Sequence, residues 1–471
     1  MKNPIINKLN KIVDNDLISF HVPGHKLGQI YDRLGYTSII EKIYKMDTTE
    51  IIGTDNLHSP EGIIKESQKR ASEAFKSDYT YYLINGTTCG IQASIMAICS
   101  PKDKLIVNRD CHQSVINGCI IGDIKPIYVN SNINTENNII NGVNIDEVIN
   151  VIDSNLDAKA ILLTYPTYYG CTYDLKEICE YAHNKNMIVI IDEAHGAHLD
   201  LSNELPQTAL EQGADIVIQS THKTLPSFTQ SSMIHTKGNR IDNSKLEANL
   251  RIIQSSSPSY TLMASLELAV DIYINSGKDL MNELLFNIDK FKNSIKSKMP
   301  INIHNDYDKT KIFIESKKLG LTGYKLEEVL RKKYNIQVEL SNYYGVLLIC
   351  TIGNVSKDFE QLEKALINIY NKCSDEIYIE EIIYPKDMPI QALTPREAFY
   401  KTKKSVKIYD SIGKISGEYI IPYPPGISLL SPGEIITKEI IDYIVYCNQK
   451  GMNVSGLKDS SLESIQIINE F

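Results

Sequence analysis

The sequence predicts an α/β protein with a mostly parallel sheet, a smaller α+β domain and a C-terminal extension. Three observations lead to this prediction. Between residues 60 and 235, short apolar runs alternate with helical stretches, which is the pattern of a βαβ series. Each expected strand is apolar almost throughout, as strands covered on both faces are. A second, shorter alternation of strands and helices follows a long helical stretch at 259–297.

These elements divide the chain into four predicted parts: an N-terminal arm (1–60), a major domain (61–285), a small α+β domain (286–380) and a C-terminal domain (381–471). The clearest major-domain strands are expected at 104–108, 160–164, 187–191 and 215–219, with a helix at 175–184 that Asp174 is placed to cap. The small domain is expected to contain strands at 311–315, 336–339 and 346–352 and helices at 324–334 and 359–370. The Asn-rich stretch 130–144 is predicted to be a surface loop.

Composition excludes several classes of protein. The 471 residues exceed the usual size of one domain. With 49 Lys and Arg against 58 Asp and Glu, the net charge of -9 argues against a nucleic-acid partner. No run approaches the ~20 apolar residues of a membrane span, and the N-terminus has no apolar signal segment. Nine cysteines without a CxxC pair favour reduced thiols and a cytoplasmic protein over a disulfide framework or a zinc site.

Polar side chains follow four of the predicted strands, where ligands of open α/β sheets bind. Lys223, after the fourth strand, could lose its proton in a desolvated site and attack a carbonyl, for which the aldehyde of pyridoxal 5'-phosphate is the obvious candidate. Asp192, after the third, would keep the pyridine nitrogen protonated, so that the ring accepts electrons from a carbanion. The plainer interpretations are that Lys223 is a solvated lysine and that Asp192 is a helix cap or a metal ligand.

The turn NGTTCG at 85–90 lies between an expected strand (79–84) and an apolar helix (91–99), and it offers the N–H groups and hydroxyls that a phosphate needs. A plain strand-to-helix turn explains it equally well. Two other function classes stay open. A metal-dependent hydrolase would use Asp192, His195, His198 and His112 as ligands, but it gives Lys223 no role. The third class is a catalytically silent binding or scaffold protein.

Nine motifs run almost from end to end of the chain: HVPGHK (21–26), LINGTT (83–88), NRDCH (108–112), LTYPTYYG (163–170), DEAHGAH (192–198), QSTHKTL (219–225), QSSSPSY (254–260), TPREA (394–398) and YPPG (423–426). In order and spacing they resemble the bacterial ornithine/lysine/arginine decarboxylases, pyridoxal-phosphate enzymes of the aspartate aminotransferase fold (fold type I). The HVPGHK motif begins at His21, so we expect the short, Gram-positive type without an N-terminal wing domain.

The resemblance implies that the major domain binds pyridoxal phosphate. Lys223 would bind the aldehyde, Asp192 would pair with the pyridinium nitrogen, and His195 would lie near the ring hydroxyl. His112 would stack on the ring, and Lys223 or His222 would return a proton to the substrate. The residues expected at the phosphate are Gly86, Thr87, Thr88, Ser220, His222 and, across a homodimer interface, Ser256.

The implied reaction is decarboxylation of a basic amino acid. We expect arginine, giving agmatine for polyamine synthesis, with lysine or ornithine as alternatives and a fold type I aminotransferase as a more distant one. Selecting a basic side chain requires acidic groups, for which Glu434 and Glu397 are candidates. Arg396 could anchor the substrate carboxylate. A helix cap, a surface ion pair or domain packing would explain these three residues equally well.

Overall fold

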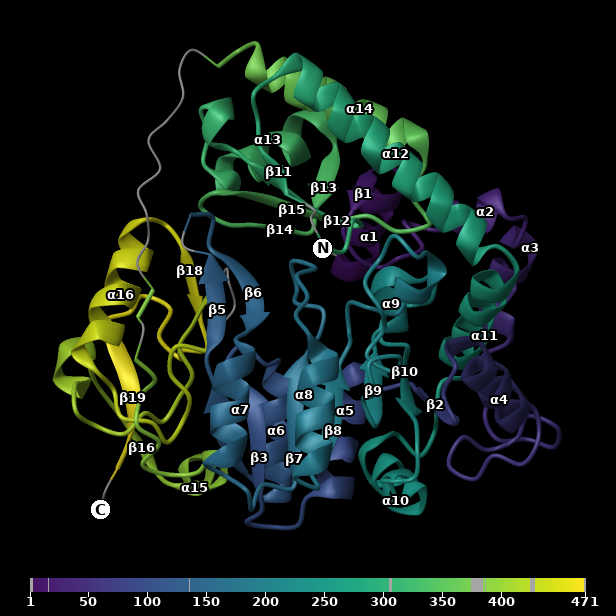
Figure 1. Ribbon diagram of the computed structural model, residues 1–471. Coiled ribbons are helices and arrows are strands. Elements are labelled where there is room, and N and C mark those ends of the chain that lie inside the picture. The colour runs from purple at the N-terminus through teal and green to yellow at the C-terminus, as the bar shows by residue number, and fades with distance from the viewer. Residues whose placement is uncertain are drawn as a thin grey trace.

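The computed structural model describes residues 3–469 except 16, 135, 305–306, 374–383, 386 and 424–427. Its architecture confirms the α/β prediction. A sheet covered by helices forms the lower centre of Figure 1, a small domain lies above it, and the C-terminal domain lies at its side. The predicted boundary at 380/381 and residues 424–426 of the YPPG motif lie outside the described residues.

The central sheet has seven strands in the order β2-β10-β9-β8-β7-β3-β4. Strand β10 runs antiparallel to both of its neighbours, and the remaining pairs are parallel. Strands β3 and β7 have the predicted bounds, whereas β8 and β9 each begin one residue later than expected. The strands are β2 (Tyr79–Leu83), β3 (Lys104–Asn108), β4 (Lys125–Val129), β7 (Ala160–Thr164), β8 (Ile188–Asp192), β9 (Ile216–Gln219) and β10 (Ser232–Thr236).

Helices cover both faces of this sheet, which explains why its strands are apolar throughout. Successive strand residues point to opposite faces, so Ile106 packs in one core cluster while Leu105 and Val107 pack in another. Helices α5 (Gly86–Ile98), α6 (Gln113–Gly122) and α10 (Asn243–Ile253) contribute to the cluster of Leu105. Helices α7 (Ile145–Asp153) and α8 (Leu175–Asn184) contribute to the other, and Asp174 caps α8 as predicted.

The helical stretch at 259–297 consists of two helices, α11 (Tyr260–Asn275) and α12 (Gly277–Lys298). The predicted boundary between residues 285 and 286 falls inside α12, which runs unbroken across the top of Figure 1. The small domain has an antiparallel sheet of order β11-β12-β15-β14. Its elements are β11 (Ile303–His304), β12 (Lys311–Glu315), α13 (Gly323–Tyr334), β13 (Ile336–Val338), β14 (Leu340–Ser341), β15 (Gly345–Ile349) and α14 (Ser356–Tyr370).

The N-terminal arm contacts both the small domain and the major domain, since the Tyr260 hydroxyl of α11 donates to the Asp55 carbonyl. Strand β1 (Ile18–Phe20) pairs in parallel with β13, so the first strand of the chain joins an element more than three hundred residues later. The helices of the arm are α1 (Pro4–Val13), α2 (Gln29–Arg33) and α3 (Thr37–Ile40), and α4 (Ile63–Phe75) follows it at the start of the major domain.

The Asn-rich stretch 130–144 is not a loop, as predicted, but a hairpin of β5 (Ser131–Asn134) and β6 (Ile139–Val143). Its apolar residues Ile139, Ile140 and Val143 are buried, and that burial outweighs the low strand preference of Asn. Asn138 adopts a φ of 57°, which Asn tolerates better than most residues.

The C-terminal domain packs against the β3 and β4 side of the sheet (Figure 1). It contains α15 (Pro395–Tyr400), β16 (Lys403–Lys407), β17 (Ile421–Tyr423), α16 (Lys438–Gln449), β18 (Asn453–Ser455) and β19 (Ser464–Ile468). Thr394 and Glu397 form a reciprocal capping box at the start of α15. Within the part of the chain that the structure describes, no helix combines the length and apolar character needed to cross a membrane.

Candidate functional site

Lys223 lies in α9 (Thr221–Thr224), the short turn that directly follows β9. Its Nζ is 3.0 Å from Nε2 of His195, which lies in the loop after the neighbouring strand β8. Burial lowers the pKa of Lys223, and Lys311 lowers it further, whereas the carboxylates of Asp192 and Glu339 oppose that shift. Because the neutral amine is the nucleophilic form, this desolvated position favours attack on a carbonyl.

Asp192 is the last residue of β8 and only 3% of it is exposed. Its Oδ1 accepts a hydrogen bond from the backbone N–H of Ala194 at 3.1 Å. Burial raises the pKa of Asp192, and the charges of His112 and Lys223 act in the opposite direction. A buried carboxylate is stable in its charged form only beside a cation, so Asp192 is suited to bind a cationic group.

Two further predicted histidines lie beside these residues. His112 is the N-cap of α6, where its side chain accepts a hydrogen bond from the Ser114 N–H. Its pKa is lowered mainly by burial, raised by the Asp192 charge and lowered by Lys223, so its ring is close to both. His222 is held by a 2.7 Å contact between its Nδ1 and the Ser231 carbonyl. Burial lowers the pKa of His222 to about 4, which leaves its ring neutral near pH 7.

The NGTTCG turn and the β9 turn bring hydroxyl groups together at the N-terminus of α5. Gly86, the first residue of α5, has a φ of 73°, a backbone conformation that favours glycine. Thr87 Oγ1 lies 2.5 Å from Ser220 Oγ and 3.0 Å from Ser232 Oγ. Thr88 is exposed at the same turn. A helix N-terminus lined with hydroxyls is suited to a phosphate group.

Sequence reasoning missed Ser232, because it begins the antiparallel strand β10 and follows no predicted strand end.

These residues fit pyridoxal phosphate. Thr221 Oγ1, in the same turn as Lys223, and Nδ1 of His195 are buried, and no described residue hydrogen-bonds to either atom. A ring hydroxyl and a phosphate would supply the partners that such atoms need. Together with the Lys223 amine and the Asp192 carboxylate, the site matches the aldehyde, ring nitrogen, hydroxyl and phosphate of this cofactor.

The histidines proposed as metal ligands have other partners. His195 faces Lys223, and His198 Nε2 contacts Asp308 at 3.2 Å and Thr310 at 3.0 Å. Across the described ranges, no three His, Cys, Asp or Glu side chains are grouped to hold a metal ion. The geometry therefore favours the lysine-centred interpretation over the hydrolase.

Glu339 is an acidic residue near Lys223 that sequence reasoning did not select. It lies between β13 and β14, and it accepts hydrogen bonds from the Tyr168 hydroxyl at 2.6 Å and from the Val22 N–H at 2.9 Å. The Tyr168 ring meets the His195 ring edge-on, with 4.6 Å between their centroids. Tyr168 belongs to the LTYPTYYG motif, whereas Glu339 belongs to no motif, and no local pattern indicates its position near Lys223.

The structure does not support Glu434 as the group that recognises a substrate. Its two oxygens bind the Arg109 guanidinium at 2.6 and 2.8 Å, and Oε2 also accepts the Ser431 N–H at 2.7 Å. Glu434 is 1% exposed and Arg109 is 6% exposed. The carboxylate is therefore already neutralised by a cation of the same chain.

Arg396 lies away from Lys223, and its contacts favour the domain-packing alternative over an anchor for the substrate carboxylate. It donates to the carbonyls of Ile120 and Ile121 at 2.9 and 2.8 Å, at the C-terminal end of α6. His112 caps the opposite end of this ten-residue helix, about 15 Å away. Glu397 is the helix-capping residue described above. Ser256 is exposed, and its contact with a second copy stays a prediction.

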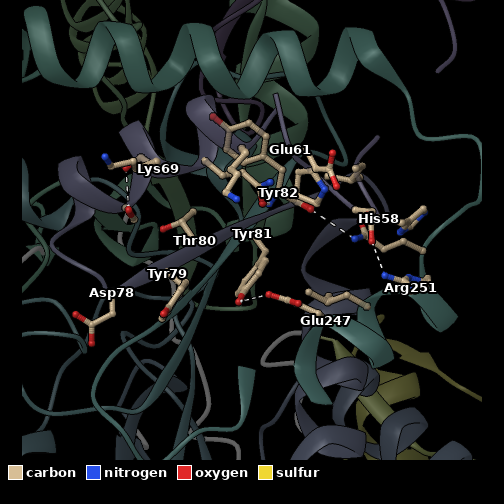
Figure 2. A pocket seen from close by; sticks show the side chains of 18 residues that line it. His58, Glu61, Lys69, Asp78, Tyr79, Thr80, Tyr81, Tyr82, Glu247 and Arg251 are labelled. Carbon is tan, nitrogen blue, oxygen red and sulfur yellow. Dashed lines mark hydrogen bonds between the residues drawn. The ribbon is translucent and has the colours of Figure 1, made fainter. Parts of the chain in front are cut away.

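A separate cavity of about 610 Å³ lies at the β2 edge of the sheet, between residues of α4, β2 and α10 (Figure 2). Its labelled wall includes His58, Tyr81, Glu247 and Arg251, and the Tyr81 hydroxyl donates to Glu247 at 3.0 Å. None of the predicted site residues lines it. The candidate site around Lys223 is therefore distinct from this cavity.

Two family models match this chain. Residues 3–317 match the family model described as "Orn/Lys/Arg decarboxylase, major domain". Residues 378–461 match the one described as "Orn/Lys/Arg decarboxylase, C-terminal domain".

Similar proteins span almost the whole chain. An arginine decarboxylase of Bacillus subtilis is 35% identical over 482 residues, covering 100% of this chain and 98% of the relative. An arginine decarboxylase of Bacillus anthracis is 34% identical over 484 residues, with the same coverage. Among solved structures, the lysine decarboxylase of Francisella novicida superposes with a TM-score of 0.78 at 21% identity, over 99% of this chain and 81% of that one. This last likeness concerns the fold, which is that of the pyridoxal-phosphate enzymes of fold type I.

Proposed function

Because the chain belongs to the Orn/Lys/Arg decarboxylase family, we propose that it is a pyridoxal-phosphate-dependent decarboxylase that converts arginine into agmatine and carbon dioxide. The observation that carries the proposal is that Lys223 and Asp192 lie close together. Asp192 ends β8, and Lys223 lies in the turn after β9, the neighbouring parallel strand. Two arginine decarboxylases at 35% and 34% identity favour arginine over lysine and ornithine.

Each residue of the site has a task in this reaction. Pyridoxal phosphate supplies an electron-accepting ring for the pair of electrons released when the bond from Cα to the carboxylate breaks. Asp192 would hold a proton at the ring nitrogen, and His112 would cover one face of the ring. Thr87, Ser220 and Ser232 would anchor the phosphate. Lys223 would deliver the proton that takes the place of the departing carboxylate at Cα. His222 is less suited to that task, because its ring is neutral near pH 7 and its one N–H donates to the Ser231 carbonyl.

The substrate's cationic side chain requires a negative partner, and Glu339 is suited to that task. Its carboxylate is close enough to Lys223 to raise the pKa of that lysine. Tyr168 and Val22 each donate to it, and these two bonds fix its direction. Glu339 is half-buried, so its carboxylate is still accessible to a guanidinium. Glu339 replaces Glu434 in our proposal for substrate recognition.

The test is amine and carbon dioxide production by the purified, cofactor-loaded protein with arginine, lysine and ornithine offered separately. We expect agmatine from arginine as the main product. The variant Lys223→Ala should produce none while retaining the circular dichroism spectrum of the wild type. Full activity in this variant would exclude Lys223 as the reactive group. Amino-group transfer without carbon dioxide would instead favour the aminotransferase alternative.

The remaining parts of the proposal concern assembly and setting. We propose a homodimer in which Ser256 of one copy reaches the phosphate of the other, supported by the exposure of Ser256. A cytoplasmic location and a role in polyamine synthesis accompany this proposal, supported by nine free cysteines. Analytical ultracentrifugation tests the dimer.

A further inference from the structure

The segment 18–26 attaches firmly to the small domain. Strand β1 pairs with β13, and Asn354 donates to the carbonyl of Ser19 at 3.0 Å. The Lys26 ammonium, 4% exposed, donates to the carbonyls of Ile349 at 2.8 Å and His21 at 2.7 Å. Apart from the bond to His21, which lies within the segment, these contacts hold the segment against the small domain.

Within this segment, Gly24 reaches the turn that carries Lys223. Its N–H donates to the His222 carbonyl at 2.7 Å. That carbonyl belongs to the peptide group that joins His222 to Lys223, so the bond orients the backbone of the reactive lysine. A Cβ added at Gly24 would lie 2.5 Å from the Leu225 carbonyl oxygen and 2.9 Å from its carbon. Only glycine allows this approach, because both obstructing atoms are backbone.

The other side of Gly24 is held by the small domain. Its carbonyl accepts a hydrogen bond from Thr351 Oγ1 at 2.6 Å, and a Cβ at Gly353 would lie 2.7 Å from the same carbonyl oxygen. Thr351 is 1% exposed. The backbone of Gly24 is therefore enclosed between the Lys223 turn and the loop that follows β15.

We infer that Gly24 and Thr351 are positioning residues for Lys223, which connect the small domain to the reactive amine through the hydrogen bonds of the Gly24 peptide groups. Neither side chain touches the reacting atoms. This inference rests on the proposed role of Lys223. The inference accounts for Gly24 in the HVPGHK motif, to which the proposed chemistry assigns no role.

The decisive variant is Thr351→Val, which keeps the side-chain shape and removes the hydroxyl donor. Thr351→Ser restores that donor. The control is Thr322→Val, which removes a hydroxyl of the same domain that caps α13 and does not contact segment 18–26. For each protein we would measure kcat and KM for arginine, the melting temperature, and the pH dependence of the visible absorbance of bound pyridoxal phosphate.

We expect Thr351→Val to lower kcat about tenfold, which is less than the ~100-fold cost of misplacing a reacting group by about 1 Å, with KM nearly unchanged. The absorbance titration should shift in Thr351→Val and return in Thr351→Ser. Gly24→Ala should show the same shift or fail to fold. If Thr351→Val and Thr322→Val have the same kcat and the same titration, the inference is wrong. Wild-type protein without decarboxylase activity would refute the proposed function, while the titration would still test the positioning of Lys223.

Discussion

Replacing Glu434 by Gln separates a structural role of this residue from the substrate contact that its motif suggested. The change keeps the size of the side chain and removes its charge. The Arg109 guanidinium, 6% exposed, then has no anion beside it. One of the two oxygens that accept hydrogen bonds from Arg109 and the Ser431 N–H is also replaced by an amide nitrogen, which donates. Removing one partner of a buried ion pair costs about 3–5 kcal/mol, because the remaining charge stays buried.

Glu434→Gln should therefore lower the free energy of unfolding by about 3–5 kcal/mol. Urea unfolding followed by circular dichroism measures this, and kinetics at low temperature measure KM for arginine on the folded protein. Asp442→Asn is the matched control, because Asp442 is in the same domain and forms only an exposed pair with Lys438. A stable Glu434→Gln protein with a strongly raised KM would refute our reasoning and restore Glu434 as a substrate residue.

Two further outcomes follow from the site and the core. Glu339→Gln should raise KM for arginine about tenfold or more, since hydrogen bonds to charged groups are worth ~1.5–3 kcal/mol; an unchanged KM would exclude the contact. Burial lowers the pKa of His25 to about 4 and that of His235 to about 3, so below pH ~6.5 the unfolded chain binds protons that the folded chain does not. The melting temperature should be constant near neutral pH and fall as the pH drops from ~6.5 toward 4, and a higher value at pH 5 than at pH 7.5 would contradict this.

Much of the major domain could be predicted because its strands carry a local signal. Burial on both faces makes β3, β7, β8 and β9 apolar throughout, and residues at the carboxyl ends of parallel strands must converge. This reasoning located Asp192, His195 and Lys223, which the structure brings together. The same reasoning failed for the hairpin at 131–143, where three buried apolar residues are enough to overcome an Asn-rich composition.

The sequence left two interpretations open for Glu434 and Arg396, a substrate contact and a structural role, and the contacts within the chain favour the structural one. Both residues lie in conspicuous motifs, but a motif does not reveal whether its charge faces the pocket or a partner within the chain. Arg109, which neutralises Glu434, is 325 residues away in the sequence. Glu339 lacks a motif altogether and reaches Lys223 only through the packing of the small domain on the sheet. Local sequence patterns do not encode such distant pairings.

Because β1 pairs with β13 of the small domain, this pairing also determines the order in which the parts of the chain can fold. Lys26 and its acceptor Ile349 are 323 residues apart. During synthesis at ~5–20 residues per second, the segment 18–26 must wait on the order of 15–60 s for its partners to leave the ribosome. The sheet can form before then, but the turn of Lys223 lacks the bond from Gly24 until β15 has been made. Cofactor capture in its final geometry is therefore a late event, and the apolar first strand needs protection in the meantime.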